Sequence, residues 1–566
     1  MKKLCMLVIL ILCLTAACST PAAPTATPET PPTPTPLPPT ALPTTRPAEQ
    51  VPPLPVERGD LFSASGVCTV CHTQMIDAAG NDVSTDTFWR ASMMANSSRD
   101  PYWRASVRGE VISNPDYRAV IEDKCATCHT PMARFTATAA AGQAALLDDG
   151  FFSTANDLHA LAIDGVSCNL CHQIMATNLG TPESYSGGYA IDTELPAGER
   201  LAYGPYVVGK NLVQIMQSAS GFIPQQGLHV EESELCATCH TLYTPYVDEA
   251  GQIAGEFPEQ MPYLEWLHSD YAAQRSCQSC HMPPAQGGVR LSITGGPQRE
   301  PFYQHTFVGG NAYMLSILGA FGQDMAVTAS KTQFADKAER IVEQLQQRTA
   351  TVAVEAVTLS GSELTAQVVV ESAVGHKFPS GFPARRAWLH LMVQDAAGQV
   401  VFESGAVQPS GAIVGNNNDT DPAAYEPHYQ EISASDQVQI YEAIMEDTMG
   451  RATTTLLRGA GYAKDNRLLP LGFDKATADA DIGVYGGAAE DEDFLGGKDV
   501  VLYRVDVGDA QGPFTVTARL LYQSIGYRWA DNLRRYDSPE SQAFLSYYDT
   551  IPNLPALIAS ATVQTE

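Results

Sequence analysis

Two hydrophobic patterns divide the chain near residue 350. Before that point the sequence indicates short helices joined by loops, and a longer helix closes this part. Ser330 or Thr332 is expected to cap that helix. Its apolar residues recur at helical spacing, and they are Phe334, Ala338, Ile341, Val342 and Leu345. We therefore expect a mainly α/irregular domain over residues 58–349.

After residue 350 the period changes to two, which is typical of strands with one buried face. The pattern marks strands near 352–356, 364–370, 388–393, 400–402, 501–507 and 514–520. Turn sequences separate these runs, so we expect an antiparallel β-sandwich over residues 350–530. An insertion at 425–480 is expected to be partly helical, at 437–445 and 464–469. Residues 531–566 are expected to form a short helical tail with a frayed end.

The first 17 residues have the pattern of an export signal. Two lysines precede an apolar run from Leu4 to Leu14, which is too short to cross a membrane as a stable helix. The run leads into Leu-Thr-Ala-Ala-Cys at 14–18, which is similar to a bacterial lipobox. We expect a lipid on Cys18, with ordinary secretion and cleavage nearby as the alternative.

Residues 18–57 form a linker rich in proline and threonine. Positions 19–57 contain 14 prolines and nine threonines, a composition that cannot bury a core and favours an extended, partly polyproline conformation. At about 3.1 Å per residue such a segment reaches on the order of 100 Å. The sequence therefore predicts a stalk that holds the folded part of the chain away from a membrane.

The pattern C-x-x-C-H occurs five times between Cys68 and His281. Two cysteines at this spacing form thioethers to the vinyl groups of a haem, and the next residue supplies the proximal nitrogen to its iron. The thioether cysteines are Cys68, Cys71, Cys125, Cys128, Cys168, Cys171, Cys236, Cys239, Cys277 and Cys280. The proximal histidines are His72, His129, His172, His240 and His281. We expect five covalently bound haem c groups, and export agrees with this because attachment takes place outside the bacterial cytoplasm.

A structural zinc site is the alternative use of C-x-x-C. Zinc sites pair two such knuckles and do not require a histidine after each one, so an odd number of motifs that all carry histidine favours haem. The other three of the 13 cysteines lie in the first 18 residues, which leaves none for a disulfide framework. Five haems would form much of the core, so the chain without haem is expected not to fold.

The formal net charge of −29 excludes nucleic acid as a partner. An acidic surface suits a soluble carrier or one that docks basic redox proteins. The part after residue 350 contains no Ser-His-Asp order, phosphate loop or H-E-x-x-H motif that would give it chemistry of its own.

The ligand on the far side of each iron decides whether that haem transfers electrons or does chemistry. Seven histidines lie outside the motifs, and the candidates for distal ligands among them are His159, His229, His305, His376 and His268. His390 on a strand and His428 in a loop are expected to be hydrogen-bonded bystanders. Methionine is the other ligand type and raises the potential of a haem. Its candidates are Met93 and Met94, with packing against a haem as the alternative.

Two polar segments of the second part have simpler interpretations. Residues 416–421 are Asn-rich and Asp-rich, so they could hold a calcium ion, but a polar turn is the interpretation we favour. The acidic run at 490–493 is expected to be a solvated loop.

The motifs and their surroundings resemble multihaem cytochromes of the cytochrome c-552/c-554 type, which are related to hydroxylamine-oxidoreductase-like haem proteins. The resembling segments are 164–172, 266–283 and 305–311, and in the second part 375–381 and 385–388. The resemblance implies closely packed haem pairs, mostly with two histidine ligands, that conduct electrons. It also implies that His376 reaches back to a haem. No C-x-x-C-K motif and no seven- or eight-haem array is present, which lowers the expectation of an enzyme.

The sequence therefore favours an exported, lipid-anchored pentahaem c-type cytochrome over an enzyme. Its expected partners are other redox proteins or membrane electron-transfer complexes in the periplasm or at the cell surface. One alternative is a multihaem oxidoreductase with one open iron that acts on a small nitrogen or sulfur compound. Another is that the β-sandwich serves adhesion or assembly.

Overall fold

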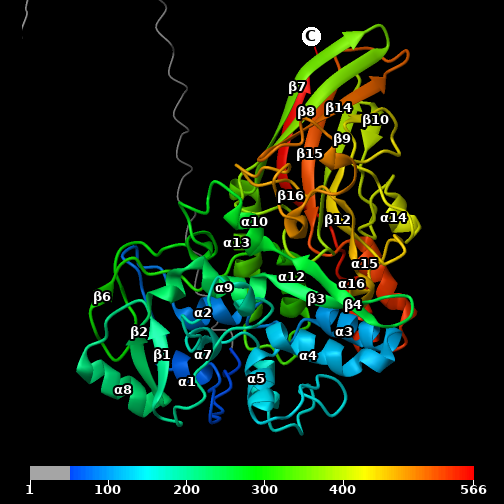
Figure 1. Ribbon diagram of the computed structural model, residues 1–566. Coiled ribbons are helices and arrows are strands. Elements are labelled where there is room, and N and C mark those ends of the chain that lie inside the picture. The colour runs from blue at the N-terminus through cyan, green and yellow to red at the C-terminus, as the bar shows by residue number, and fades with distance from the viewer. Residues whose placement is uncertain (1–50, 566) are drawn as a thin grey trace, which may run out of the picture. The chain divides into compact units, whose positions relative to one another are not determined.

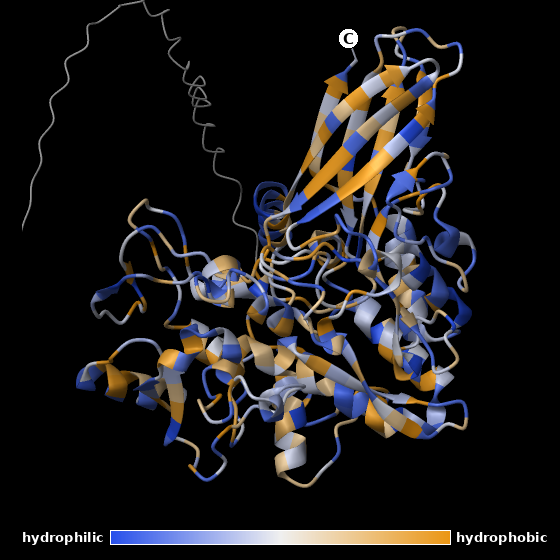
Figure 2. Cartoon of the chain, turned by 45° about the horizontal axis from the view of Figure 1, so that its top comes forward, coloured by the Kyte–Doolittle hydropathy of each residue, from blue (hydrophilic) through white to orange (hydrophobic). Residues whose placement is uncertain are grey.

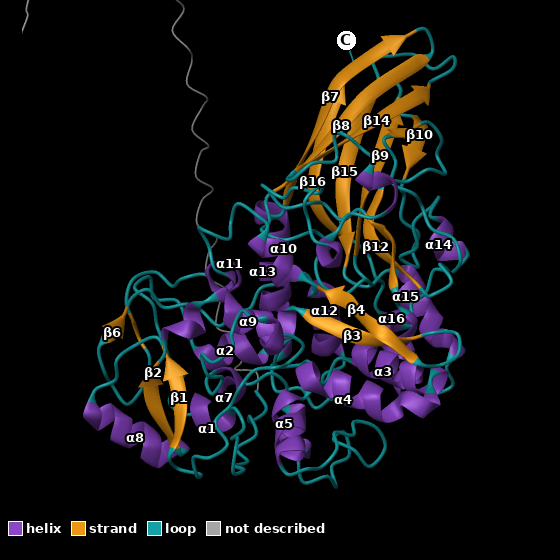
Figure 3. Ribbon diagram, in the orientation of Figure 1, coloured by secondary structure: helices purple, strands orange, loops and turns teal. Residues whose placement is uncertain are grey.

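Short helices fill the chain from residue 66 to residue 348 in the computed structural model, which describes residues 51–565 (Figures 1 and 3). The export signal, Cys18 and most of the linker lie outside the described residues. The helices are α1 Gly66–Thr69, α2 Thr85–Arg90, α3 Pro101–Ser113, α4 Arg118–His129, α5 Pro131–Ala139, α6 His159–Ile163, α7 Cys168–Cys171, α8 Lys210–Ser220, α9 Ser233–His240, α10 Pro262–Leu267, α11 Cys277–His281, α12 Ala312–Ala320 and α13 Lys331–Arg348. Within residues 51–565, no helix has the length and apolar content needed to cross a membrane.

Three two-stranded sheets interrupt these helices. They are β1 Arg200–Gly204 with β2 Phe222–Gln226, β3 Leu242–Val247 with β4 Ile253–Gln260, and β5 Val289–Arg290 with β6 Gln298–Arg299. The first pair is parallel and the other two are antiparallel. Loops make up much of the remaining chain in this part, as expected for a domain with little regular core of its own.

Local signals set where the longer helices begin. Asp100 accepts hydrogen bonds from the N–H groups of Tyr102 and Trp103, and Pro101 occupies the first position of α3. Of the two caps considered for α13, the structure uses Ser330, which forms a capping box with Gln333. The face of α13 predicted from its period is turned inward, with Phe334, Ile341 and Leu345 buried.

After residue 350 the chain forms two larger sheets (Figure 3). The first has the order β13-β12-β9-β15-β16 with β10 also paired to β9, and the second has the order β11-β14-β8-β7. Their strands are β7 Ala350–Ser360, β8 Glu363–Ser372, β9 Arg386–Gln394, β10 Val400–Ser404, β11 Glu431–Ile432, β12 Ile440–Glu446, β13 Gly461–Asp465, β14 Lys498–Asp506, β15 Thr515–Gln523 and β16 Ala556–Gln564. The pairs are antiparallel except for β11 with β14.

The two sheets share one buried core. Figure 2 shows the alternation of apolar and polar positions along the long strands. Inward residues of β8, β9, β14 and β15 belong to a single apolar cluster, among them Val368, Leu391, Tyr503 and Leu520. The same cluster includes residues of α12 and α13, so the sheets and the last helices of the first part pack together.

Three expectations for this part were wrong. Residues 464–469 were expected to be helical, but they contain the end of strand β13 and no helix. Residues 437–445 were expected to be helical, but most of them form strand β12, which pairs with β9 and β13. Its first six residues are all buried, so the strand is covered on both faces and lacks the alternation typical of a strand with one buried face. The expected frayed tail contains helix α16 Pro539–Thr550 and then strand β16, which adds an edge to the larger sheet. Short helices α14 Asn417–Thr420 and α15 Tyr527–Asp531 complete the fold.

Candidate functional site

All five C-x-x-C-H motifs line one cavity. Every motif cysteine and every motif histidine contributes to its wall, and the cavity volume is about 1420 Å³. Sites for a single small ligand measure roughly 300–1,000 Å³, so this cavity is larger than one such ligand requires. The wall also carries many apolar side chains, including Val67, Leu170, Leu235 and Val308. A large, mostly apolar cofactor set fits a wall of this composition.

Each cysteine pair is presented by helical or near-helical backbone. The second motif ends α4, the third opens as α7, the fourth ends α9 and the fifth forms α11, while the first begins in α1. Residues three apart on a helix lie on the same side. The thiols of each motif are therefore placed to bond one planar ligand, and the histidine that follows lies beside them.

Four of the motif histidines are oriented in the same way. Their Nδ1 atoms donate to backbone carbonyls, which leaves Nε2 available as a ligand atom. The distances are 2.8 Å from His72 to Leu291, 2.9 Å from His129 to Ser97, 2.5 Å from His172 to Tyr203 and 2.5 Å from His281 to Val308. Burial lowers the pKa of His129 and His240 to about 4, so both are neutral, as metal ligation requires.

Two motif histidines face a second histidine across the cavity. The ring centroids of His172 and His305 are 6.3 Å apart with planes inclined by 25°, and those of His281 and His376 are 6.2 Å apart with planes inclined by 15°. Two imidazoles that bind one metal from opposite sides, with bonds of about 2 Å each, hold their centroids roughly 6 Å apart. His305 and His376 therefore have the separation from a motif histidine that a distal ligand would have.

Three other predicted ligands lie outside the cavity wall. Nε2 of His229 is 2.9 Å from the carbonyl oxygen of Ile174 and donates to it, so the atom that usually binds a metal is engaged. His159 and His268 donate through Nδ1 to Phe151 and Leu264, at 2.9 and 2.8 Å. A histidine that lies close to a motif in the sequence therefore need not line the cavity.

Met93 and Met94 do line the cavity. The backbone carbonyl of Met94 accepts from the N–H of Val166, which ties this segment to the third motif. Met216 on α8 also lines the wall, although the sequence did not single it out. The structure pairs none of these three thioethers with a particular motif histidine, so their role as ligands stays a prediction.

Trp103 is a further wall residue that the sequence left without a role. Its ring stacks on His129 with a centroid distance of 4.1 Å and planes inclined by 2°. Such a contact, together with the Nδ1 bond to Ser97, restricts rotation of the imidazole. The signal in the sequence was an aromatic residue just inside the capped start of α3.

Neighbouring motifs are in contact through their cysteines. The thiols of Cys68 and Cys168 interact closely enough that each shifts the pKa of the other, which relates the first motif to the third. The fourth motif touches the second through Cys239 and Cys128. It touches the fifth through Cys236 and Cys277, and Cys171 of the third lies in electrostatic range of Cys239. The five motifs therefore form one connected group, with the fourth at its branch point.

A buried ion network holds the loop that carries His376. The ammonium of Lys377 is 2.8 Å from Asp465, and Arg467 is 2.7 Å from Asp465 and 2.9 Å from Glu265. Glu265 on α10 also accepts from the backbone N–H of Lys377 at 3.0 Å. Burial raises the pKa of Asp465, but Arg467 and Lys377 outweigh burial and hold that pKa well below its usual range. The network joins the sheets to the haem-motif region beside the candidate ligand.

Two acidic side chains line the cavity beside the second motif. Burial raises the pKa of Glu110 to about 7, even though the N–H groups of Leu456 and Leu457 donate to its carboxylate. Burial also raises the pKa of Glu259. Both carboxyl groups act electrostatically on Cys125. They are groups that could exchange protons with the contents of the cavity.

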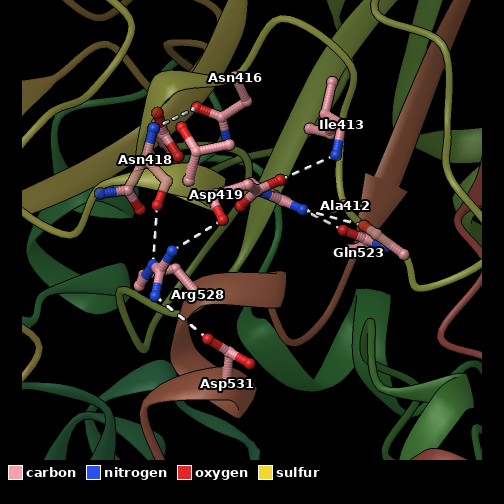
Figure 4. Close-up of polar contacts among 12 residues, drawn as sticks. Ala412, Ile413, Asn416, Asn418, Asp419, Gln523, Arg528 and Asp531 are labelled. Atoms are coloured by element: carbon pink, nitrogen blue, oxygen red, sulfur yellow. Dashed lines mark hydrogen bonds and ion pairs between the residues drawn. The ribbon is translucent and has the colours of Figure 1, made fainter.

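The polar segment 416–421, expected to be a turn, forms the one-turn helix α14 after its cap Asn416 (Figure 4). The carboxylate of Asp419 accepts from Arg386 at 2.7 Å and from the N–H of Ile413 at 2.8 Å. The carbonyl oxygens of Asn418 and Asp419 both accept from Arg528, at 2.7 Å each. These oxygens are occupied by donors, which leaves little for a calcium ion.

His428 forms a buried cluster with Asp491 and Asp499, in which one atom of each lies within 4.8 Å of the others. Backbone N–H groups donate to the amide oxygens of Gln439 and Asn466, so their NH₂ groups face Nδ1 of His428, at 2.9 and 3.0 Å. Nδ1 is thus an acceptor, and Nε2 carries the proton that it donates to Asp491 at 2.9 Å. A metal ion would need a free lone pair on a ring nitrogen of His428. Nδ1 already accepts hydrogen bonds and Nε2 carries a proton, so the cluster is a hydrogen-bond network. The expectation that residues 490–493 form a solvated loop was wrong for Asp491, which is only 2% exposed.

The Asp499→Asn substitution is expected to flatten the dependence of stability on pH. Burial raises the pKa of Asp499 to about 7, above the unfolded value of about 3.9. A raised carboxyl pKa contributes stability that is complete below the unfolded pKa and is lost as pH rises through the folded one. The slope from this group is at most about 1.4 kcal/mol per pH unit between about pH 4 and pH 7.

Guanidinium unfolding followed by circular dichroism measures this slope in the holoprotein. Asp509→Asn, at an exposed position beyond the end of β14, is the matched control and should keep the wild-type slope. An equal slope in the Asp499→Asn variant and the wild type would contradict the assignment.

Comparison with known proteins adds one structural similarity. No protein-family model matches the chain, and no curated protein matches it. Among solved structures, the chain is similar to a penta-heme cytochrome c552 from Thermochromatium tepidum, with a TM-score of 0.48 and 16% sequence identity. The similarity covers 88% of this chain and 98% of that chain. The function proposed below therefore rests on the residues of this chain.

Proposed function

We propose that this protein is an exported pentahaem c-type cytochrome that transfers electrons between membrane-linked and periplasmic or extracellular redox partners. The observation that carries the proposal is the convergence of five C-x-x-C-H motifs on one cavity, with neighbouring motifs in contact through their cysteines. The bound haems supply reversible one-electron chemistry at iron. The chain supplies spacing, ligands and exclusion of water.

The residues divide into clear roles under this proposal. The ten motif cysteines hold the haems covalently, and the five motif histidines are the proximal ligands. His305 and His376 are the distal ligands opposite His172 and His281, as their ring separations of 6.3 and 6.2 Å support. The ion network of Lys377 and Asp465 keeps His376 in place.

Export and anchoring belong to the same proposal. The amino-terminal signal, a lipid on Cys18 and the proline-rich stalk would place the cavity outside the cytoplasm and close to a membrane. The net charge of −29 favours docking with basic redox proteins. The expected partners are such proteins or a membrane electron-transfer complex.

A second function is supported by the motif histidines that lack a facing histidine. Among the described residues, no histidine pairs with His72, His129 or His240 in the way that His305 and His376 pair with their partners. Arg385 lines the cavity near His240, and Glu110 lines it near the second motif. An iron without a protein ligand beside such groups would suit an oxidoreductase that acts on a small nitrogen or sulfur compound.

Intact mass and low-temperature EPR of the exported holoprotein test both functions. Five covalent haems are expected, and fewer would overturn the pentahaem assignment. Five low-spin irons would support the carrier and exclude an open site. A high-spin signal equal to one haem that shifts with nitrite, hydroxylamine or cyanide would replace the carrier with the oxidoreductase. The amount of high-spin iron therefore decides between them.

A further inference from the structure

Lys337 is a buried lysine that points into the cavity without a partner. It lies on α13, is 3% exposed and contributes to the cavity wall. Among the described residues, its Nζ has no hydrogen-bond partner and no ion pair. Burying an ammonium without an anion is costly, and burial here lowers the pKa of Lys337 to about 7.

The other fully buried lysines show what Lys337 lacks. Lys377 is 2.8 Å from the carboxylate of Asp465, and Lys464 is 3.1 Å from that of Glu442. Each of these ammonium groups also donates to a backbone carbonyl. Lys377 and Lys464 are thus each paired with a carboxylate. Lys337 has no such partner, and it borders the cavity.

The surroundings of Lys337 supply no anion from α13 itself. Ile341 and Leu345, on the same face of the helix, are apolar and line the cavity with it. Arg340, one turn further along, is a second cation and adds to the lowering of the pKa of Lys337. His281 of the fifth motif lies in electrostatic range of Lys337. The missing negative charge is therefore expected from whatever fills the cavity beside the fifth motif.

We propose that Lys337 forms a salt bridge with a propionate carboxylate of the haem bound to Cys277 and Cys280. This inference rests on the proposed haem binding and adds a positioning and tuning residue to it. A cation beside the propionate offsets a negative charge near the iron, which favours the reduced, less positive state. A small anion from solution has the same chemistry as the propionate, so the experiment must separate the two.

The test compares potentiometric titrations of the full-length holoprotein, after intact mass has shown that all five haems are attached. K337M should lower one of the five midpoint potentials by about 59 mV. For a one-electron couple this corresponds to a reduction equilibrium constant that is about tenfold smaller. K337R should keep the wild-type value because it retains the charge. K331M, an exposed lysine in the first turn of the same helix, should change none of the five.

Three outcomes would overturn the proposal. Unchanged potentials in K337M, with five haems attached, would show that Lys337 does not act on a haem, while the proposed haem binding would stand. A new high-spin EPR signal equal to one haem would make Lys337 an iron ligand. A difference between K337M and wild type that emerges only with added nitrite would assign Lys337 to a solution anion. If K337M does not accumulate, K337Q, which also removes the charge, should show the same lowered potential.

Discussion

Protein produced without haem attachment is expected to lose the structure of residues 58–349. The five motifs surround a cavity of about 1420 Å³ that the side chains leave unfilled. An unfilled cavity of this size would expose its largely apolar wall to water and would remove packing contacts from the surrounding helices. Native domains are stable by only about 5–15 kcal/mol, so the helices around the motifs cannot stay in place without the cofactor.

Circular dichroism and limited proteolysis measure this loss. The same chain is expressed once in a host that attaches haem to C-x-x-C-H and once without export, where attachment does not occur. We expect a weak helical signal and rapid cleavage between residues 58 and 349 in the second preparation. A cooperative unfolding transition with an unchanged midpoint in the haem-free chain would contradict a core made largely of haem.

Replacing His376 by glycine is expected to convert one haem of the five from low spin to high spin. The ring of His376 stands 6.2 Å from that of His281, at the separation of two ligands to one iron. Removing it leaves that iron with a weak ligand or none. Added imidazole should enter the vacated space and restore the low-spin signal, which a merely structural role of His376 would not predict.

His229→Gly is the matched control for this experiment. His229 and His376 were equally plausible ligands from the sequence, but the Nε2 atom of His229 is bonded to the carbonyl of Ile174. The EPR spectrum of the His229 variant should keep every low-spin signal. A loss of low-spin iron in His229→Gly, with none in His376→Gly, would reverse the assignment. His305→Gly should behave like His376→Gly at the haem of the third motif.

Short-range patterns can be read from the sequence because their physical cause is local. The C-x-x-C-H motif is defined within five residues, and one helical turn is enough to place two cysteines and a histidine together. The same holds for the Ser330 cap and the inward face of α13. Alternation marked several strands of the larger sheets, including β8, β9 and β15.

The sequence patterns gave wrong predictions where pairing with a neighbouring strand determines the secondary structure. The pattern of β12 is compatible with a helix or a strand, and only its position between β9 and β13 settles the matter. The last residues have no strong alternation, yet β16 gains an edge of the sheet through hydrogen bonds with β15. Tertiary pairing outweighed local preference in both cases.

The sequence by itself predicts five haem-attachment motifs, the cysteines and histidines that would carry the haems, and an export signal. Only the tertiary structure decided which histidines face one another, because His172 and His305, or His281 and His376, meet through folding of distant segments. The same is true of Lys337, whose unpaired charge becomes visible only once the cavity beside it is formed. A ligand pair depends on distance in space, and sequence separation does not measure that distance.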